Sequence, residues 1–210
     1  MLGAGLVDLQ SPQDSINKDS PLIILCEGVN AEEDSKFYNT LFKYEARHSM
    51  FISAQGEAQL FYNYLYFLSV KDEISANFEI VSLKDRDNKF ASIEDIKNEV
   101  ELKPGLKYTY KRAKELYIYN EETMNYFRDA KKTKIISEKK KVFDAEIIRI
   151  EDKTNAKESC SYKGIKGKWL DLFETKIDPK EITETKIAEI IRNNKDTSEI
   201  YKELHDLIFN

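Results

Sequence analysis

Acidic residues follow two hydrophobic segments of this chain, at the positions where each segment would end as a β-strand. Residues 22–26 read Leu-Ile-Ile-Leu-Cys and are followed by Glu27. Residues 78–83 read Phe-Glu-Ile-Val-Ser-Leu, and Asp85 and Asp87 come directly beyond them. In an open parallel sheet, the carboxyl ends of the strands gather along the edge where ligands bind. We therefore expect Glu27, Asp85 and Asp87 to converge at this edge.

Three carboxylates at one edge repel one another unless a cation lies between them, and oxygen ligands suit Mg²⁺ or Mn²⁺. Such a site fits phosphodiester cleavage, because paired divalent cations about 4 Å apart activate a water molecule and neutralise charge on the phosphoryl oxygens. We expect Glu27, Asp85 and Asp87 to hold one ion and to be catalytic.

A second ion would need further carboxylates. Asp34 or Glu33, together with Glu115, could supply them. Lys168 could donate a hydrogen bond to the phosphate or to the leaving oxygen, and we predict a catalytic role for it.

Each of these residues also has a structural alternative. Glu27 could cap the next helix, where a negative charge suits the helix dipole. Asp85 and its neighbours could form an exposed turn. Glu115 could pair with Lys111 at helical spacing, and Lys168 could be a solvated lysine in a loop.

Positive charge is concentrated in the middle of the chain, although the net charge is -5. Residues 107–114 read Lys-Tyr-Thr-Tyr-Lys-Arg-Ala-Lys, and lysine runs follow at 131–134 and 139–141. The net charge argues against adhesion to nucleic acid by the whole surface, but a basic face can follow a phosphate backbone. The alternative is a solvated surface. The residues that we expect to bind nucleic acid are Lys111, Arg112, Lys114 and Lys166.

Length and composition describe a chain of 210 residues, of which 34% are charged. This length fits one domain, or one domain with an appendage. No apolar run approaches the roughly 20 residues that cross a bilayer, and residues 1–20 lack the pattern of a secretory signal. Cys26 and Cys160 have no metal-binding spacing, and two histidines make a zinc site improbable. We expect a cytoplasmic protein with reduced cysteines and no membrane contact.

The first half of the chain predicts alternating strands and helices. Strands are expected at 22–26, 50–54 and 78–83, and helices at 32–44 and 57–70. This β-α-β-α-β order predicts an α/β fold with a parallel sheet flanked by helices. The many aromatic side chains of helix 57–70 are expected to pack in the core.

The second half predicts mostly helices. We expect them at 93–100, 121–130, 183–193 and 197–208, and 142–150 is mixed. Residues 116–119 read either as a strand or as the end of a helix that begins near residue 112. The predicted division is a lead-in at 1–20, a catalytic domain at 21–175 and C-terminal helices at 176–210.

The placement of Glu27-Gly28 after one strand and of Asp85-Arg86-Asp87 after a later one resembles the Toprim domain. This is the catalytic fold shared by topoisomerases, bacterial primases and the OLD-family nucleases (overcoming lysogenization defect). Three further segments resemble standalone OLD-like Toprim proteins, and they lie at 36–38, 112–118 and 167–170. The chain departs from the family after Glu27-Gly28, where the usual acid is displaced, so that Glu32, Glu33 or Asp34 could take its place.

The resemblance implies a Mg²⁺- or Mn²⁺-dependent nuclease that cuts DNA or RNA. It also implies an effector of phage defence that works with a separate ABC-type or AAA ATPase, and a possible homodimer. Glu27 would then be either a metal ligand or the general acid/base. The alternative is a non-catalytic or partner-regulated Toprim subunit that binds metal or nucleic acid. Primase or topoisomerase chemistry is a third reading, against which the short chain argues.

Overall fold

Four parallel strands form a sheet in the order β2-β1-β3-β4. This is a computed structural model, and it describes residues 20–28, 33–45, 48–73, 77–86, 93–102, 105–111, 113–151 and 164–210. The strands are β1 (Leu22–Cys26), β2 (Ser49–Ser53), β3 (Glu79–Lys84) and β4 (Leu106–Tyr108). The predicted α/β fold with a parallel sheet flanked by helices is confirmed.

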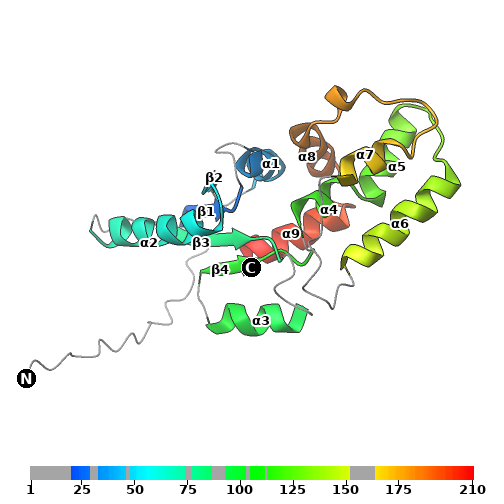
Figure 1. The fold of residues 1–210 in the computed structure, drawn as a ribbon. Helices are drawn as coiled ribbons and strands as arrows, with labels where there is room; N and C mark the ends of the chain where they lie inside the picture. Colours follow the sequence, from blue (N-terminus) through cyan, green and yellow to red (C-terminus); the bar gives the residue numbers. More distant parts are fainter. Residues whose placement is uncertain are drawn as a thin grey trace, which may run out of the picture.

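Helices connect the strands and make up most of the second half of the chain (Figure 1). The first three are α1 (Glu33–Leu41), α2 (Glu57–Glu73) and α3 (Ile93–Leu102). Then follow α4 (Lys114–Ile118), α5 (Glu121–Ala130), α6 (Ser137–Glu151), α7 (Ile165–Leu170), the 3-10 turn η2 (Pro179–Glu181), α8 (Glu184–Asn193) and α9 (Glu199–Phe209). Residues 116–118 therefore form the end of α4 and Tyr119 caps it, so this segment is not a strand.

The two faces of the sheet bury different sets of side chains, because successive residues of a strand point to opposite sides. Leu22, Ile24 and Cys26 of β1 join the main core, which also contains α1 and the later helices. Leu25 lies on the other face, in a smaller core that α2 covers. The sheet is thus buried on both faces, which explains why the strands read as nearly continuous apolar runs.

The C-terminal helices share the main core with the sheet. Trp169, Ile187 and Leu204 are fully buried in the same cluster as Leu22. Two long-range hydrogen bonds fix the arrangement: Arg192 Nη1 of α8 donates to the carbonyl oxygen at the end of α1 (Thr40, 2.7 Å), and the Lys107 ammonium of β4 donates to a carbonyl of α9 (Leu207, 2.7 Å). These helices are additions to the α/β unit that contribute to its core.

Side-chain caps start three of the later helices. Asn120 and Thr123 form a capping box at α5, in which each side chain accepts a hydrogen bond from the backbone N–H of the other residue. The hydroxyl groups of Thr183 and Ser198 cap α8 and α9. Such caps satisfy N–H groups that have no partner within the helix.

The outer edge of β2 is covered by a side chain. The amide of Asn39, on α1, donates to the Phe51 carbonyl oxygen at 2.8 Å and accepts from the Phe51 N–H at 3.0 Å. These are the two backbone groups that another strand would use at this position. The side chain thus satisfies the outward-facing backbone groups at the middle of the edge strand.

Helix α2 differs from the prediction that its aromatic residues all pack inward. Leu60, Tyr64, Phe67 and Leu68 pack on the sheet, whereas Phe61, Tyr62, Leu65 and Tyr66 are exposed. A sheet face can cover only one side of a helix, so a helix that is apolar all round keeps an apolar side outside. In the described part of the chain, no helix is both long and apolar enough to cross a membrane.

Candidate active site

Glu27 and Asp85 follow neighbouring strands at the same edge of the sheet. Strand β1 pairs with β3 in a register that aligns Cys26 with Leu83. Glu27 is therefore level with Lys84, one position before Asp85. The pairing of β1 with β3 thus brings the backbones of these two acids to the same edge of the sheet, and their joint binding of an ion stays a prediction. Asp87 lies outside the described residues.

The turn after β2 fixes the backbone at Glu27. The Gly56 N–H donates to the Glu27 carbonyl oxygen at 2.7 Å, and the Ala54 N–H donates to the Cys26 carbonyl oxygen at the same distance. Gly56 has a φ of 111°, a conformation that strongly favours glycine. Gly56 thus positions the backbone at Glu27 through this hydrogen bond.

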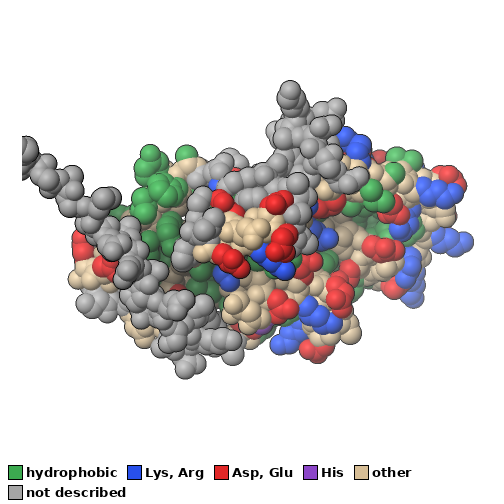
Figure 2. All heavy atoms as spheres, turned by 90° about the horizontal axis from the view of Figure 1, so that it is seen from below, with side chains coloured by type: hydrophobic (Ala, Val, Ile, Leu, Met, Phe, Trp, Pro, Cys, Tyr) green, Lys and Arg blue, Asp and Glu red, His purple; other side chains and the backbone are tan. Residues whose placement is uncertain are grey.

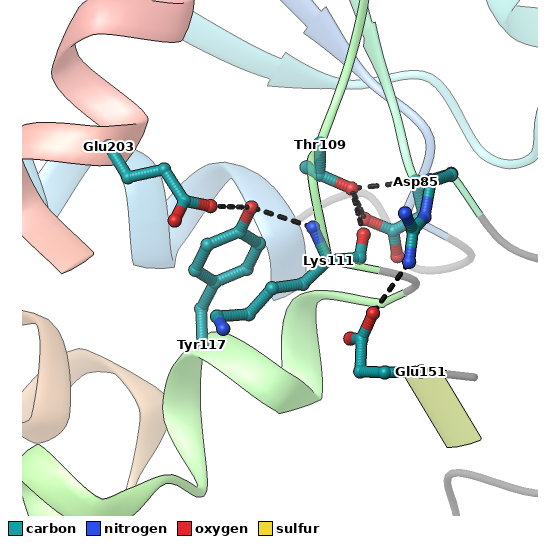
Figure 3. A network of polar contacts seen from close by, with 7 residues as sticks. Asp85, Thr109, Lys111, Tyr117, Glu151 and Glu203 are labelled. Carbon is teal, nitrogen blue, oxygen red and sulfur yellow. Dashed lines mark hydrogen bonds and ion pairs between the residues drawn. The ribbon is translucent and has the colours of Figure 1, made fainter. Parts of the chain in front are cut away.

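The Asp85 carboxylate contacts the segment that follows β4 (Figure 3). Its Oδ2 accepts a hydrogen bond from the backbone N–H of Lys114 at 3.2 Å, and its Oδ1 lies 3.4 Å from the Thr109 hydroxyl. That hydroxyl lies 2.8 Å from the Lys111 carbonyl oxygen and accepts the backbone N–H of Arg86 at 3.2 Å. Thr109 is fully buried. Through its hydrogen bonds it links the end of β3 to the segment after β4.

Arg86 points away from solvent and pairs with the end of α6. Its guanidinium donates to Glu151 Oε2 at 2.5 Å, and its side chain is 7% exposed. The Arg86 Nε is buried and has no hydrogen-bond partner among the described atoms. The middle residue of the Asp85-Arg86-Asp87 motif is thus a buried cation, which we did not predict.

Lys111 and Tyr117 continue the network toward α9 (Figure 3). The Lys111 backbone N–H donates to the Tyr117 hydroxyl at 3.0 Å, which itself donates to Glu203 Oε1 at 2.7 Å. The Lys111 ammonium lies 5.5 Å from the centre of the Tyr117 ring. Burial, together with the negative charge of Glu203, raises the pKa of Tyr117 well above its usual value.

Lys114 has a buried side chain. Its ammonium pairs with Glu184 Oε2 of α8 at 2.9 Å, and only 7% of the side chain is exposed. Of the residues that we expected to bind nucleic acid, Lys111 is half-buried beside the site, and Arg112 lies outside the described residues. Lys166, on α7, donates to the Ile182 carbonyl oxygen at 3.0 Å.

Lys168 contacts α6. Its ammonium lies 3.1 Å from Glu146 Oε1, and half of its side chain is exposed. Hydrogen bonds from Arg149 and from Lys168 lower the pKa of Glu146 to about 2. The described structure thus gives Lys168 a partner between α6 and α7, and its predicted catalytic role stays a prediction.

The remaining predicted metal ligands lie on two helices. Glu115, on α4, is half-buried. Burial raises the pKa of Tyr119, and the negative charges of Glu184 and Glu115 raise it further. Asp34 belongs to α1, and its side chain lies outside the description. The described residues contain no group of three or more Asp, Glu, His or Cys side chains that could hold a metal ion. Glu27 and Asp85 nevertheless supply the oxygen donors that suit Mg²⁺ or Mn²⁺.

Three partners around the site were not predicted from the sequence: Thr109, which lies beside Asp85, Glu151, which pairs with Arg86, and Glu203, which accepts from Tyr117. Residues 107–110 alternate in a way typical of a strand, which could have indicated β4 and placed Thr109 at its end. Glu151 and Glu203 are far from the motif in sequence, and no local pattern marks them.

Comparison of the chain with protein-family models, with curated proteins and with solved structures finds no match.

Proposed function

We propose that this chain is a Mg²⁺- or Mn²⁺-dependent nuclease that cleaves phosphodiester bonds in DNA or RNA. The observation that supports this most is the arrival of Glu27 and Asp85 at adjacent strand ends of a parallel sheet. Ligand sites of open α/β sheets lie at this edge. The resemblance of the surrounding motifs to OLD-like Toprim proteins gives the site its proposed reaction.

The residues have distinct roles in this proposal. Glu27, Asp85 and Asp87 would hold the ion, which supplies an activated water and neutralises charge on the phosphoryl group. The Lys114 N–H would orient Asp85, and the Thr109 hydroxyl lies 3.4 Å from the same carboxylate. Lys111, which lies beside this network, would contact the nucleic-acid backbone by charge.

The test is cleavage of plasmid DNA, single-stranded DNA and total RNA by the purified chain, in Mg²⁺, Mn²⁺ or EDTA. Asp85→Asn combined with Asp87→Asn should lower cleavage at least about 100-fold, as expected when an electrostatic group of a site is removed. Asparagine is preferred to alanine at position 85 because its carbonyl oxygen can still accept the Lys114 N–H. Alanine there would also remove a contact that holds α4.

The matched control is Asp171→Asn, which changes an exposed acid beyond α7. Its cleavage rate should equal that of the unchanged chain. Metal-dependent cleavage that persists in the double variant would contradict the proposed site. Loss of cleavage in the Asp171 control as well would show that the assay reports general damage.

A second candidate function is a regulated subunit that binds nucleic acid without cutting it. Two basic side chains beside the site are already paired within the chain, Arg86 with Glu151 and Lys114 with Glu184. These pairs favour a site that needs a partner to open it. Metal-dependent binding of labelled nucleic acid, measured by fluorescence anisotropy and without turnover, would favour this function over the first.

The biological setting of the proposal comes from the resemblance alone. In this setting, the chain would be a cytoplasmic effector of phage defence, and a separate ABC-type or AAA ATPase would assist or restrain it. Co-expression with an ATPase encoded beside the gene tests this setting: the two chains should co-purify, and the ATPase should change the rate of cleavage. Independent behaviour of the two proteins would contradict it.

A further inference from the structure

Helix α2 presents large apolar side chains on the side that faces away from the sheet. Phe61, Tyr62, Leu65 and Tyr66 are 61%, 65%, 47% and 66% exposed. Figure 2 shows hydrophobic side chains gathered at the end of the molecule where α2 lies. We call these four residues the outer face of α2. The opposite side of the same helix packs on the sheet.

The outer face of α2 is large enough to form an interface. Large apolar side chains have surfaces of about 150–250 Å² each, so the four residues together expose on the order of 500 Å². An isolated patch of this size is at the upper end for a monomer. Two such faces pressed together would bury about 1,000 Å², which is the lower bound for a specific interface.

The charge of the helix restricts what can cover this face. Residues 58–70 contain no Asp, Glu, Lys or Arg, although 34% of the chain is charged. A nucleic acid or an anionic membrane would need cations on this face to bind. The favoured occupant is therefore an uncharged, apolar surface of another protein.

A second copy of the chain satisfies this condition. The net charge is -5, so two copies repel each other in most orientations, and contact is favoured where the surface carries no charge. In a two-fold dimer the same patch meets itself. The exposed small residues Ala58 and Ser69 lie one helical turn from Tyr62 and from Leu65 and Tyr66, respectively, on the same side of α2. They leave room for the bulky residues of an antiparallel copy.

We propose that the outer face of α2 is a homodimer interface, formed by α2 of one copy packed against α2 of another. The inference stands apart from the proposed nuclease activity, because it rests only on the exposure, area and charge of this helix.

The experiment is sedimentation equilibrium of the full chain at concentrations from about 1 to 100 μM. The unchanged chain should sediment as a dimer. Leu65→Glu combined with Tyr66→Glu should raise the dissociation constant at least 100-fold, because it places four carboxylates in the proposed interface. The matched control is Val142→Glu combined with Ile148→Glu on α6, whose side chains are also exposed, and this variant should remain dimeric.

Several results would overturn the proposal. A monomer at every concentration would show that another protein, or nothing, covers the outer face of α2. A dimer that survives in the α2 variant, or that is lost in the α6 variant, would place the interface elsewhere. Far-UV circular dichroism should show equal helicity in all three proteins. If the glutamate variant is unfolded, Tyr62→Ser combined with Tyr66→Ser replaces it and should weaken the dimer in the same direction.

Discussion

The Thr109 hydroxyl lies within hydrogen-bond reach of three groups near the proposed site. It accepts the Arg86 N–H, and it lies within reach of both the Lys111 carbonyl oxygen and the Asp85 carboxylate. One hydroxyl proton can serve only one of these two acceptors at a time. Since the Lys111 oxygen is the nearer, the bond to Asp85 can strengthen only when the Lys111 bond is released.

Thr109→Val should lower the free energy of unfolding by about 1–3 kcal/mol, because it leaves the buried Arg86 N–H without an acceptor. Urea unfolding measures this loss. Thr175→Val, at an exposed threonine, should change the value by less than about 0.5 kcal/mol. Equal effects of the two substitutions would show that Thr109 does not hold the strand ends together.

The raised pKa of Tyr117 leads us to expect a loss of stability at alkaline pH. Its pKa is raised in the folded chain, so its stabilising effect is fully present below about pH 10, the usual tyrosine value. The effect is lost as pH rises above that value, because only the unfolded chain releases the proton. The Tm should fall between pH 9.5 and 11, and it should fall less steeply in Tyr117→Phe. Parallel Tm curves for the two proteins would contradict this role.

Contacts between elements depend on a few tight positions, of which Gly105 before β4 is the clearest. Its φ is 82°, and a Cβ atom placed there would lie 2.2 Å from the Tyr64 hydroxyl oxygen of α2. Only glycine allows α2 to approach the start of β4 in this way. Gly105 is thus favoured both by its backbone conformation and by the packing of Tyr64 against it.

Gly105→Ala should cost about 2 kcal/mol or more in the free energy of unfolding, from a strained backbone and a steric clash. The cost should shrink in a Tyr64→Leu background, which a double-mutant cycle measures. Gly167→Ala on α7 is the control, because a Cβ atom there meets nothing within 4 Å. It should stabilise the chain by up to about 1 kcal/mol.

Glu146 joins α6 to α7 through Lys168, and this contact predicts sensitivity to acid. Its pKa of about 2 lies below the usual value of about 4.3. The stabilisation is therefore present above about pH 4.3 and is lost as pH falls toward 2. Thermal unfolding from pH 6 to 2.5 should show a smaller loss for Glu146→Gln than for the unchanged chain. An identical pH dependence would show that the ion pair contributes nothing.

The whole molecule has a main core that joins the sheet to the C-terminal helices, so it should unfold as one unit. Trp169 is the only tryptophan, it is fully buried in that core, and its indole N–H donates to the Asn120 carbonyl oxygen at 3.2 Å. Its fluorescence should follow the same urea transition as far-UV circular dichroism. Two separate transitions would contradict this and would be consistent with the division near residue 175 that the sequence predicts.

Strong local patterns predicted the elements well, and long-range contacts account for what was missed. Strand 22–26 and helix 121–130 have the predicted bounds, and an apolar run marks the strand in the sequence. Strand β4 has only three residues, and the short alternation at 107–110 that marks it is a weak signal. Residues 142–150 read as mixed because Val142 and Ile148 are exposed apolar residues of α6, which blurs the helical periodicity.

In the candidate site, too, residues with a local sequence signal were predictable and long-range contacts were not. Glu27 and Asp85 were predictable because each follows a recognisable strand, and parallel strands bring their ends together. The pairs Arg86–Glu151 and Tyr117–Glu203 join residues that are far apart in sequence. They arise only once the sheet, α6 and α9 have packed, so no local spacing predicts them.

The Asn39 amide at the edge of β2 has a consequence for how the protein behaves when crowded. An open edge strand can recruit a strand of a neighbouring molecule and seed aggregates in which sheets extend from chain to chain. Asn39 occupies both Phe51 backbone groups that such a strand would need. Contacts between molecules are thereby directed away from this edge of the sheet and toward surfaces made of helices, where side chains and not backbone groups decide which partner fits.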